Sequence, residues 1–140
     1  MRIPLEPRIE ALTEQVIAAA FAVSNALGHG FLEVVYRNAL VEELVARDIH
    51  GIIEKSYPVH YRGKVVGRYT ADLVVEDAVI VELKAIEALA KVHHIQVLNY
   101  LKASGLPVGL LFNFGLPKIQ IKRVLLTLAE EPQSTPKPTG

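Results

Sequence analysis

Apolar residues recur along this chain with two different periods, which together predict the order of helices and strands. Leu12, Val16, Ala20, Val23 and Leu27 follow helical spacing and predict a first helix over residues 8 to 27. Further helices are expected at 31–48 and about 89–103, and strands at 52–61, 65–75, 78–84, 108–113 and 118–125. This order, ααβββαββ, predicts an α/β domain in which helices flank a mixed β-sheet.

Composition narrows the class of protein. The chain has 140 residues, is 51% hydrophobic and contains no cysteine, so we expect one compact domain over residues 1–128 without disulfides or cysteine-bound zinc. Residues 129–140 hold three prolines in twelve positions and are predicted to be a disordered tail. The apolar runs are too short to span a membrane and no secretion pattern is present, so we expect a soluble, cytoplasmic protein.

Charge is balanced overall and uneven along the chain. The formal net charge is zero, which argues against a protein that coats nucleic acid without specificity. Residues 1–61 carry a net charge of −3, residues 62–123 carry +4, and the remaining residues carry −1. The positive segment has the polarity that a phosphate backbone would meet, although such an excess is also ordinary for a solvated sheet edge.

Asp72, Glu82 and Lys84 lie in the strands expected at 65–75 and 78–84. Glu82 and Lys84 share one face of their strand because side chains alternate. Whether Asp72 joins them depends on the connection. A two-residue loop at Glu76-Asp77 pairs residue 72 with 81 and separates the carboxylates, whereas a three-residue loop or a bulge pairs 72 with 82.

Two carboxylates on adjacent strands suit magnesium or manganese, which prefer oxygen ligands. An ammonium at Lys84 would orient an attacking water or neutralise charge that develops on a phosphate. The alternative is a solvated ion pair with no chemical role, which is common at protein surfaces.

Two pairs of polar residues lie elsewhere at helical spacing. Gln96 and Tyr100 are one turn apart in the third helix, and Glu33 and Tyr36 follow the break at Gly30. The simpler explanation of Gln96 is that it belongs to a partly polar stripe at the edge of the core, with no role in a site. Glu33 has two simpler explanations, as a carboxylate in the first turn of a helix and as an ion-pair partner of Arg37.

Taken together, these elements resemble the GxxExxY family, a branch of the PD-(D/E)xK nuclease superfamily. The resemblance covers residues 10 to 125. Its Gln96-x-x-x-Tyr100 motif is also similar to the helix motif of RecB-type nucleases. It rests on Gly30-x-x-Glu33-x-x-Tyr36, Asp72, Glu82-x-Lys84 and Gln96-x-x-x-Tyr100, with the flanking context Leu27 to Glu33, Tyr61 to Lys64 and His93 to Leu101.

The resemblance implies a restriction-endonuclease-like core and a role for each motif residue. Asp72 and Glu82 would be metal ligands, with help from the Leu83 carbonyl and Glu33, and Lys84 would be the catalytic lysine. Gln96 and Tyr100 would support the site. The proline of the superfamily's name is replaced here by Ala71.

The sequence therefore predicts a magnesium- or manganese-dependent nuclease that hydrolyses phosphodiester bonds, with DNA favoured over RNA. The alternative is a module that keeps the nuclease fold and binds nucleic acid or protein without catalysis. The helix at 89–103 is apolar on two sides, so its outer side is expected to meet either the N-terminal helices or a second subunit in a homodimer.

Overall fold

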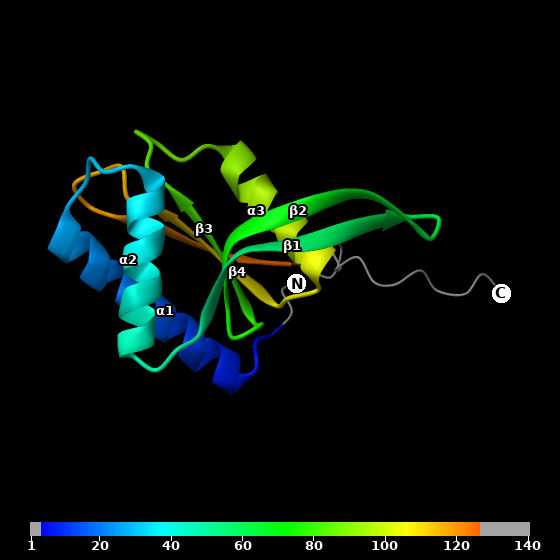
Figure 1. The fold of residues 1–140 in the computed structure, drawn as a ribbon, viewed down its shortest axis with the longest axis horizontal. Helices are drawn as coiled ribbons and strands as arrows, with labels where there is room; N and C mark the ends of the chain where they lie inside the picture. Colours follow the sequence, from blue (N-terminus) through cyan, green and yellow to red (C-terminus); the bar gives the residue numbers. More distant parts are fainter. Residues whose placement is uncertain (1–3, 127–140) are drawn as a thin grey trace.

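The computed structural model describes residues 4–126, which form three helices and five strands in the predicted order (Figure 1). None of these helices is long and apolar enough to cross a membrane. The tail expected at 129–140 lies outside the described residues. The elements are α1 (Pro7–Leu27), α2 (Glu33–Ala46), β1 (Gly51–Tyr61), β2 (Lys64–Val75), β3 (Val79–Lys84), α3 (Lys91–Ser104), β4 (Val108–Asn113) and β5 (Gln120–Leu125).

The five strands form one mixed sheet in the order β1-β2-β3-β4-β5. The β1–β2, β2–β3 and β4–β5 pairs are antiparallel, while β3 and β4 are parallel. A parallel pair requires a crossover connection, and α3 supplies it between β3 and β4. The predicted mixed α/β fold is therefore confirmed.

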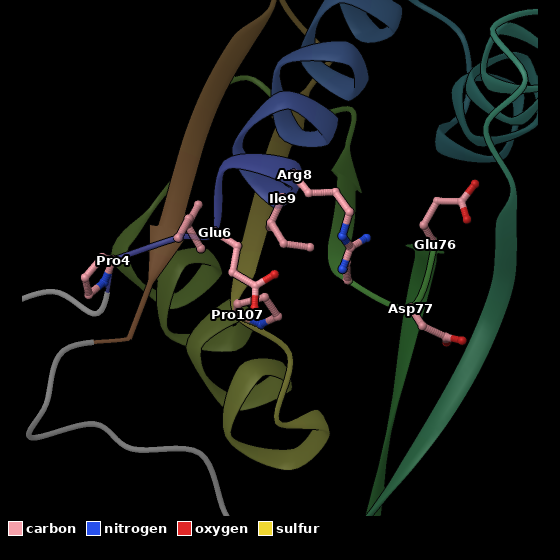
Figure 2. Close-up of a pocket in the computed structure, with 9 residues that line it drawn as sticks. Pro4, Glu6, Arg8, Ile9, Glu76, Asp77 and Pro107 are labelled. Carbon is pink, nitrogen blue, oxygen red and sulfur yellow. The ribbon is translucent and has the colours of Figure 1, made fainter.

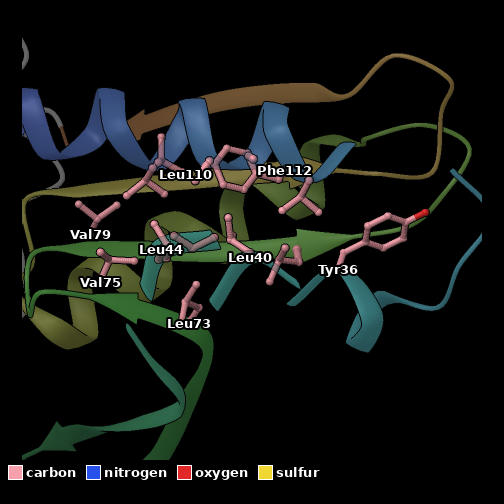
Figure 3. Close-up of a cluster of buried hydrophobic side chains, with 14 of the residues drawn as sticks. Tyr36, Leu40, Leu44, Leu73, Val75, Val79, Leu110 and Phe112 are labelled. Atoms are coloured by element: carbon pink, nitrogen blue, oxygen red, sulfur yellow. The ribbon is translucent and has the colours of Figure 1, made fainter. Parts of the chain in front are cut away.

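Helices cover both faces of this sheet. On one face, α1 and α2 bury an apolar stripe that includes Tyr36, Leu40 and Leu44, one turn apart along α2. Figure 3 shows Leu40 and Leu44 among residues of β2, β3 and β4 such as Leu73 and Leu110, with Tyr36 farther along toward one end of the sheet. Burial of each large side chain stabilises the fold by roughly 1.5–3 kcal/mol.

On the opposite face α3 packs alone, with Val97 and Leu101 fully buried against Val74, Ile80 and Leu111. The N-terminal helices lie across the sheet, so the expectation that they could cover the outer side of α3 is wrong. That side instead exposes Val92 (64%) and Ile95 (43%). Of the two lysines on this helix, Lys91 is exposed and Lys102 is half-buried.

The β1–β2 hairpin is the longest feature of the sheet and extends well past its neighbour. β2 pairs with β3 only from Leu73 to Val75, so the outer part of the hairpin has no third strand beside it, and it projects from the body of the molecule (Figure 1). Its turn at Arg62 and Gly63 has positive φ at both residues, as a two-residue type I′ turn requires. We call residues 56–71 the arm.

The edge positions of the sheet fit their residues. Pro58 lies in β1, an edge strand, where its missing N–H does no harm. The other edge, β5, begins at Gln120 rather than at residue 118, and there Lys122 is exposed while Ile119 just before the strand is buried. Differences of two residues at element ends reflect fraying.

Candidate active site

The connection between β2 and β3 fixes the register of the two strands. Val75 pairs with Val79 and Leu73 with Val81, so three residues, Glu76 to Ala78, form the loop. The structure therefore has the longer of the two connections considered from the sequence. Glu76 and Asp77 both adopt positive φ near 50°. Residue 72 consequently lies opposite residue 82.

Asp72 and Glu82 interlock where the two strands separate. The Asp72 backbone N–H donates to Glu82 Oε1 at 3.0 Å, and the Leu83 backbone N–H donates to Asp72 Oδ2 at 2.9 Å. Each carboxylate thus accepts a hydrogen bond from a backbone N–H of the neighbouring strand, in place of a strand-to-strand backbone hydrogen bond. The two carboxylates are held next to each other by the strands that carry them.

Glu82 is a buried carboxylate, only 2% exposed. Burial and the neighbouring charge of Asp72 hold the pKa of Glu82 well above its usual range, while the ammonium of Lys84 opposes that shift. Ionising the buried Glu82 beside Asp72 is therefore unfavourable unless cationic charge lies close by. The pair therefore has the electrostatics of a cation site.

Glu33 approaches the pair from the other side of the site. It is the first residue of α2, and it lines a small cavity of about 190 Å³ together with Val34, Arg37, Asp72 and Leu83. Partial burial and the charge of Asp72 raise the pKa of Glu33 above its usual value, and the ammonium of Lys84 opposes this shift. The side chains of three separate elements thus act on one another here.

Arg37 is not the partner of Glu33. Its guanidinium instead donates to Glu54 Oε1 of β1 at 3.2 Å and to Asn38. The ion-pair explanation of Glu33 is therefore wrong, while its place in the first turn of a helix is confirmed. Arg37 was not foreseen as a cavity-lining residue, because nothing along the chain connects it to Asp72.

Tyr36 fixes the loop that leads into α2. Its hydroxyl donates to the Gly28 carbonyl at 2.7 Å and accepts from the Phe31 N–H at 3.2 Å. Its ring is fully buried and stacks on Phe114 with centroids 4.6 Å apart. Gly30 in this loop has φ of 114°, which disfavours any side chain. The Gly30, Glu33 and Tyr36 spacing therefore builds a rigid entry that aims Glu33.

Gln96 and Tyr100 lie on α3, on the face of the sheet that Glu82 shares. The Tyr100 hydroxyl donates to the Thr70 carbonyl at 2.8 Å. Burial, followed by the charges of Glu82 and Asp72, raises the pKa of Tyr100, and a hydrogen bond with Gln96 opposes this shift. His93, which shares the Gln96 face, accepts a hydrogen bond from the Ala90 N–H through Nδ1 and so caps the helix.

Asn113 is a positioning residue that the sequence did not reveal. It is fully buried at the end of β4, where its side chain binds both the N–H and the carbonyl of Ile86, and also the Gly115 N–H and the Gln120 side chain. A Cβ at Gly115 would lie 2.2 Å from the Ile86 carbonyl oxygen. The segment after Lys84 is thereby locked to the β4–β5 turn.

The donor set fits a hard divalent cation that keeps part of its water shell. Across residues 4–126, no three His, Cys, Asp or Glu side chains gather closely enough to hold a metal by themselves. Asp72 and Glu82 would supply carboxylate oxygens, and Leu83 lines the small cavity together with Asp72. Magnesium is commonly held by one or two carboxylates and completed by water.

A larger cavity, of about 310 Å³, lies at the opposite end of β3, between the start of α1 and the β2–β3 turn (Figure 2). Glu6, Arg8, Glu76 and Asp77 are among its lining residues. It contains none of the predicted site residues, so size alone does not identify the site.

The fold and the paired carboxylates at the point where β2 and β3 diverge define a nuclease-like α/β protein with a restriction-endonuclease-like core. The profile of the PD-(D/E)XK nuclease superfamily matches residues 10–124, and the chain belongs to that superfamily. No curated protein matches the chain.

Among solved structures, the crystal structure of SSO0001 is similar in fold, with a TM-score of 0.54 and 19% sequence identity. The match covers 86% of this chain and 61% of SSO0001, so this chain corresponds to a part of that protein. At this identity the likeness concerns the fold alone.

Proposed function

We propose that the protein is a metal-dependent nuclease that hydrolyses phosphodiester bonds of DNA or RNA, with DNA favoured, in the cytoplasm. The observation that carries the proposal is the interlocked pair Asp72 and Glu82 beside the Lys84 ammonium and an open cavity. Membership of the nuclease superfamily supports the same reaction.

Asp72 and Glu82, with the Leu83 carbonyl, would hold one or two magnesium or manganese ions, and Glu33 would contribute from α2 directly or through water. Such an ion supplies Lewis-acid polarisation of the phosphate and lowers the pKa of a bound water. The half-buried Asp72 and the exposed Glu33 face the cavity, which leaves room for a phosphate group on the solvent side.

Lys84 would orient the attacking water or stabilise negative charge that develops on the phosphate. Tyr100 would position the strand that carries Asp72, because its hydroxyl donates to the carbonyl of Thr70, two residues before Asp72. Gln96, hydrogen-bonded to Tyr100, would hold that ring and present its own amide at the edge of the site. The Gly30-x-x-Glu33-x-x-Tyr36 segment supports assignment to the GxxExxY branch.

A cleavage panel tests the proposal. Labelled single-stranded, double-stranded and branched DNA and RNA are incubated with magnesium, with manganese and with chelator. Metal-dependent cleavage that Glu82→Gln abolishes would support it. If the protein binds these polymers and neither cleaves them nor binds metal through its carboxylates, the chain is a non-catalytic binding module.

A homodimer is the second part of the partner proposal. Val92 and Ile95 expose apolar surface on the outer side of α3, and a second subunit would bury it. Sedimentation of the wild type and of Ile95→Glu across a range of concentrations tests this. A monomer in both cases would remove the dimer from the proposal.

A further inference from the structure

The arm, residues 56–71 of the β1–β2 hairpin, has a charge unlike that of the rest of the molecule. It contains Arg62, Lys64 and Arg68 and no Asp or Glu. All three cations are exposed. None of them takes part in the ion pairs found among residues 4–126. The arm is thus a concentrated positive surface in a protein with no net charge.

Apolar residues share the tip with these cations. Tyr61 is 65% exposed, and Val65 and Val66 are 50% and 62% exposed. The register shifts at Val59 and His60, so the ribbon carries a bulge close to its end. A two-stranded ribbon with cations and exposed apolar side chains is one of the shapes that enters nucleic acid grooves.

The arm starts at the candidate active site. Asp72 follows it directly along β2, and the Tyr100 hydroxyl is bonded to the Thr70 carbonyl at its base. At about 3.3 Å per residue, Arg68 lies at most about 13 Å and Lys64 about 26 Å along the strand from Asp72. The longer reach corresponds to about eight nucleotides of a strand at about 3.4 Å each.

A groove of about 410 Å³ runs between the base of the arm and α3. Tyr69 of the arm lines it opposite Gln96 and Asn99, and the Tyr69 ring lies edge-on to Tyr100 at 5.2 Å. No acidic residue lines this groove, whose remaining walls are Val92, His93 and Ile95. The surface between the base of the arm and α3 therefore presents no negative charge to a bound strand.

We propose that the arm is a second nucleic-acid contact, which grips the phosphate backbone of the substrate up to about eight nucleotides from the bond that is cut. This inference rests on the proposed function for its substrate class. Arg62, Lys64 and Arg68 bind phosphates, and the apolar tip rests in a groove or against unpaired bases. The contact adds affinity without reading sequence, because phosphates carry no base identity.

DNA binding measured in the presence of chelator reports the contribution of the arm to affinity separately from catalysis. Fluorescence anisotropy of a labelled 20-nucleotide DNA strand and of the 20-base-pair duplex is followed across salt concentrations. Arg62→Gln/Lys64→Gln is compared with Arg8→Gln/Lys122→Gln, which removes the same charge from exposed positions away from the arm. We expect the arm variant to lower the duplex salt slope by about 2, and the control pair to leave it unchanged.

Between about 50 and about 200 mM salt, the wild type should then lose roughly tenfold more duplex affinity than the arm variant. Equal behaviour of the two double variants would overturn the inference, as would an absence of wild-type binding to both probes. If the arm variant bound DNA normally and instead shifted a dimer to monomer in light scattering, the occupant would be a second copy of the chain.

Cleavage of strands of different length separates the two proposals. With magnesium, kcat/KM of the arm variant should fall on the 20-nucleotide strand and equal that of the wild type on a strand of about five nucleotides, which is too short to reach Lys64. Arm-dependent binding without metal-dependent cleavage would end the proposed function and keep the arm as a nucleic-acid contact. If the arm variant and the wild type cleave both the long and the short strand equally well, the proposed function stands and the arm contact is ruled out.

Discussion

At the scale of single residues, Lys84 has a distinct position because its charge opposes the rise in the pKa of both Glu33 and Glu82 that burial and Asp72 cause. Lys84→Met should therefore reduce turnover by about 10² to 10³, as loss of a group that stabilises transition-state charge commonly does. Metal affinity should change little, because an ammonium is no ligand. Single-turnover cleavage and calorimetric titration with manganese measure the two effects.

Asp72→Asn should instead weaken metal binding and cleavage together. The matched control is Asp77→Asn, which alters an exposed carboxylate in the β2–β3 turn, away from the site, that pairs with Lys55 at 2.6 Å. The control should bind manganese as the wild type does. Loss of metal from Lys84→Met, with retention in Asp72→Asn, would contradict these roles.

Glu33→Gln tests the helix carboxylate. The residue is exposed and has no ion pair among residues 4–126, so stability should change by no more than about 0.5 kcal/mol. Cleavage should fall strongly, since the anion that faces Asp72 in the cavity is lost.

Glu54→Gln is the control for Glu33, because it breaks the ion pair that Arg37 does form. It should cost at most about 1 kcal/mol and leave cleavage intact. Thermal melts and cleavage rates of both variants decide the matter, and full activity in Glu33→Gln would reduce the motif to Asp72, Glu82 and Lys84.

The sequence could predict the partners within the motif and not those outside it. Alternation along β3 placed Glu82 and Lys84 on one face, which needs only local geometry. The choice of Glu54 by Arg37 depends on how α2 packs beside β1, so helical spacing alone wrongly favoured Glu33. Asn113 was missed because a single buried amide carries no periodic signal.

At the scale of elements, the lock between the β3–α3 segment and the β4–β5 turn should be essential for stability. Asn113→Ala leaves the Ile86 N–H and the Gly115 N–H without their acceptor, and we expect a loss of about 1–3 kcal/mol in the free energy of unfolding. Asn99→Ala, on the half-buried side of α3, is the control and should cost less than about 1 kcal/mol. Equal urea midpoints for both variants would contradict the lock.

The elements themselves follow from the sequence because their repeats are long and regular. All eight are present in the predicted order, with each end within two residues of its predicted position. What covers the outer side of α3 did not follow. Helical periodicity identifies an apolar face but not its partner, and here the sheet keeps α1 and α2 on its far side.

At the scale of the whole molecule, the site should reduce the stability of the metal-free protein. Folding raises the pKa of Glu82 above its unfolded value, so the stability present below the unfolded pKa of 4.5 is progressively lost as pH rises toward the folded pKa. Glu82→Gln removes this penalty. At neutral pH in chelator, the variant should be more stable than the wild type by at least about 1 kcal/mol.

Magnesium should reverse that order, since it binds the native wild type and stabilises it by mass action. Urea unfolding of both proteins, in chelator and in magnesium, checks the sign of each difference. If the metal-free Glu82→Gln protein is less stable than the wild type, the buried carboxylate does not lower the free energy of unfolding as expected.

The long β1–β2 hairpin has a further consequence for the timescale on which parts of the protein open. A two-stranded ribbon without a third strand or a covering helix is only marginally stable, and the arm beyond Tyr69 has neither along most of its length. Its backbone amides should therefore exchange with deuterium far faster than those of β3 and β4, through openings that leave the sheet intact.

Added DNA should slow exchange in the arm if the ribbon is held against it, with a smaller change in the buried strands β3 and β4. Mass spectrometry of peptides from 56–71 and from 79–84 measures both. The arm would then open less often when a polymer is bound than when the protein is free. A substrate too short to reach the arm would be held without this gain in order.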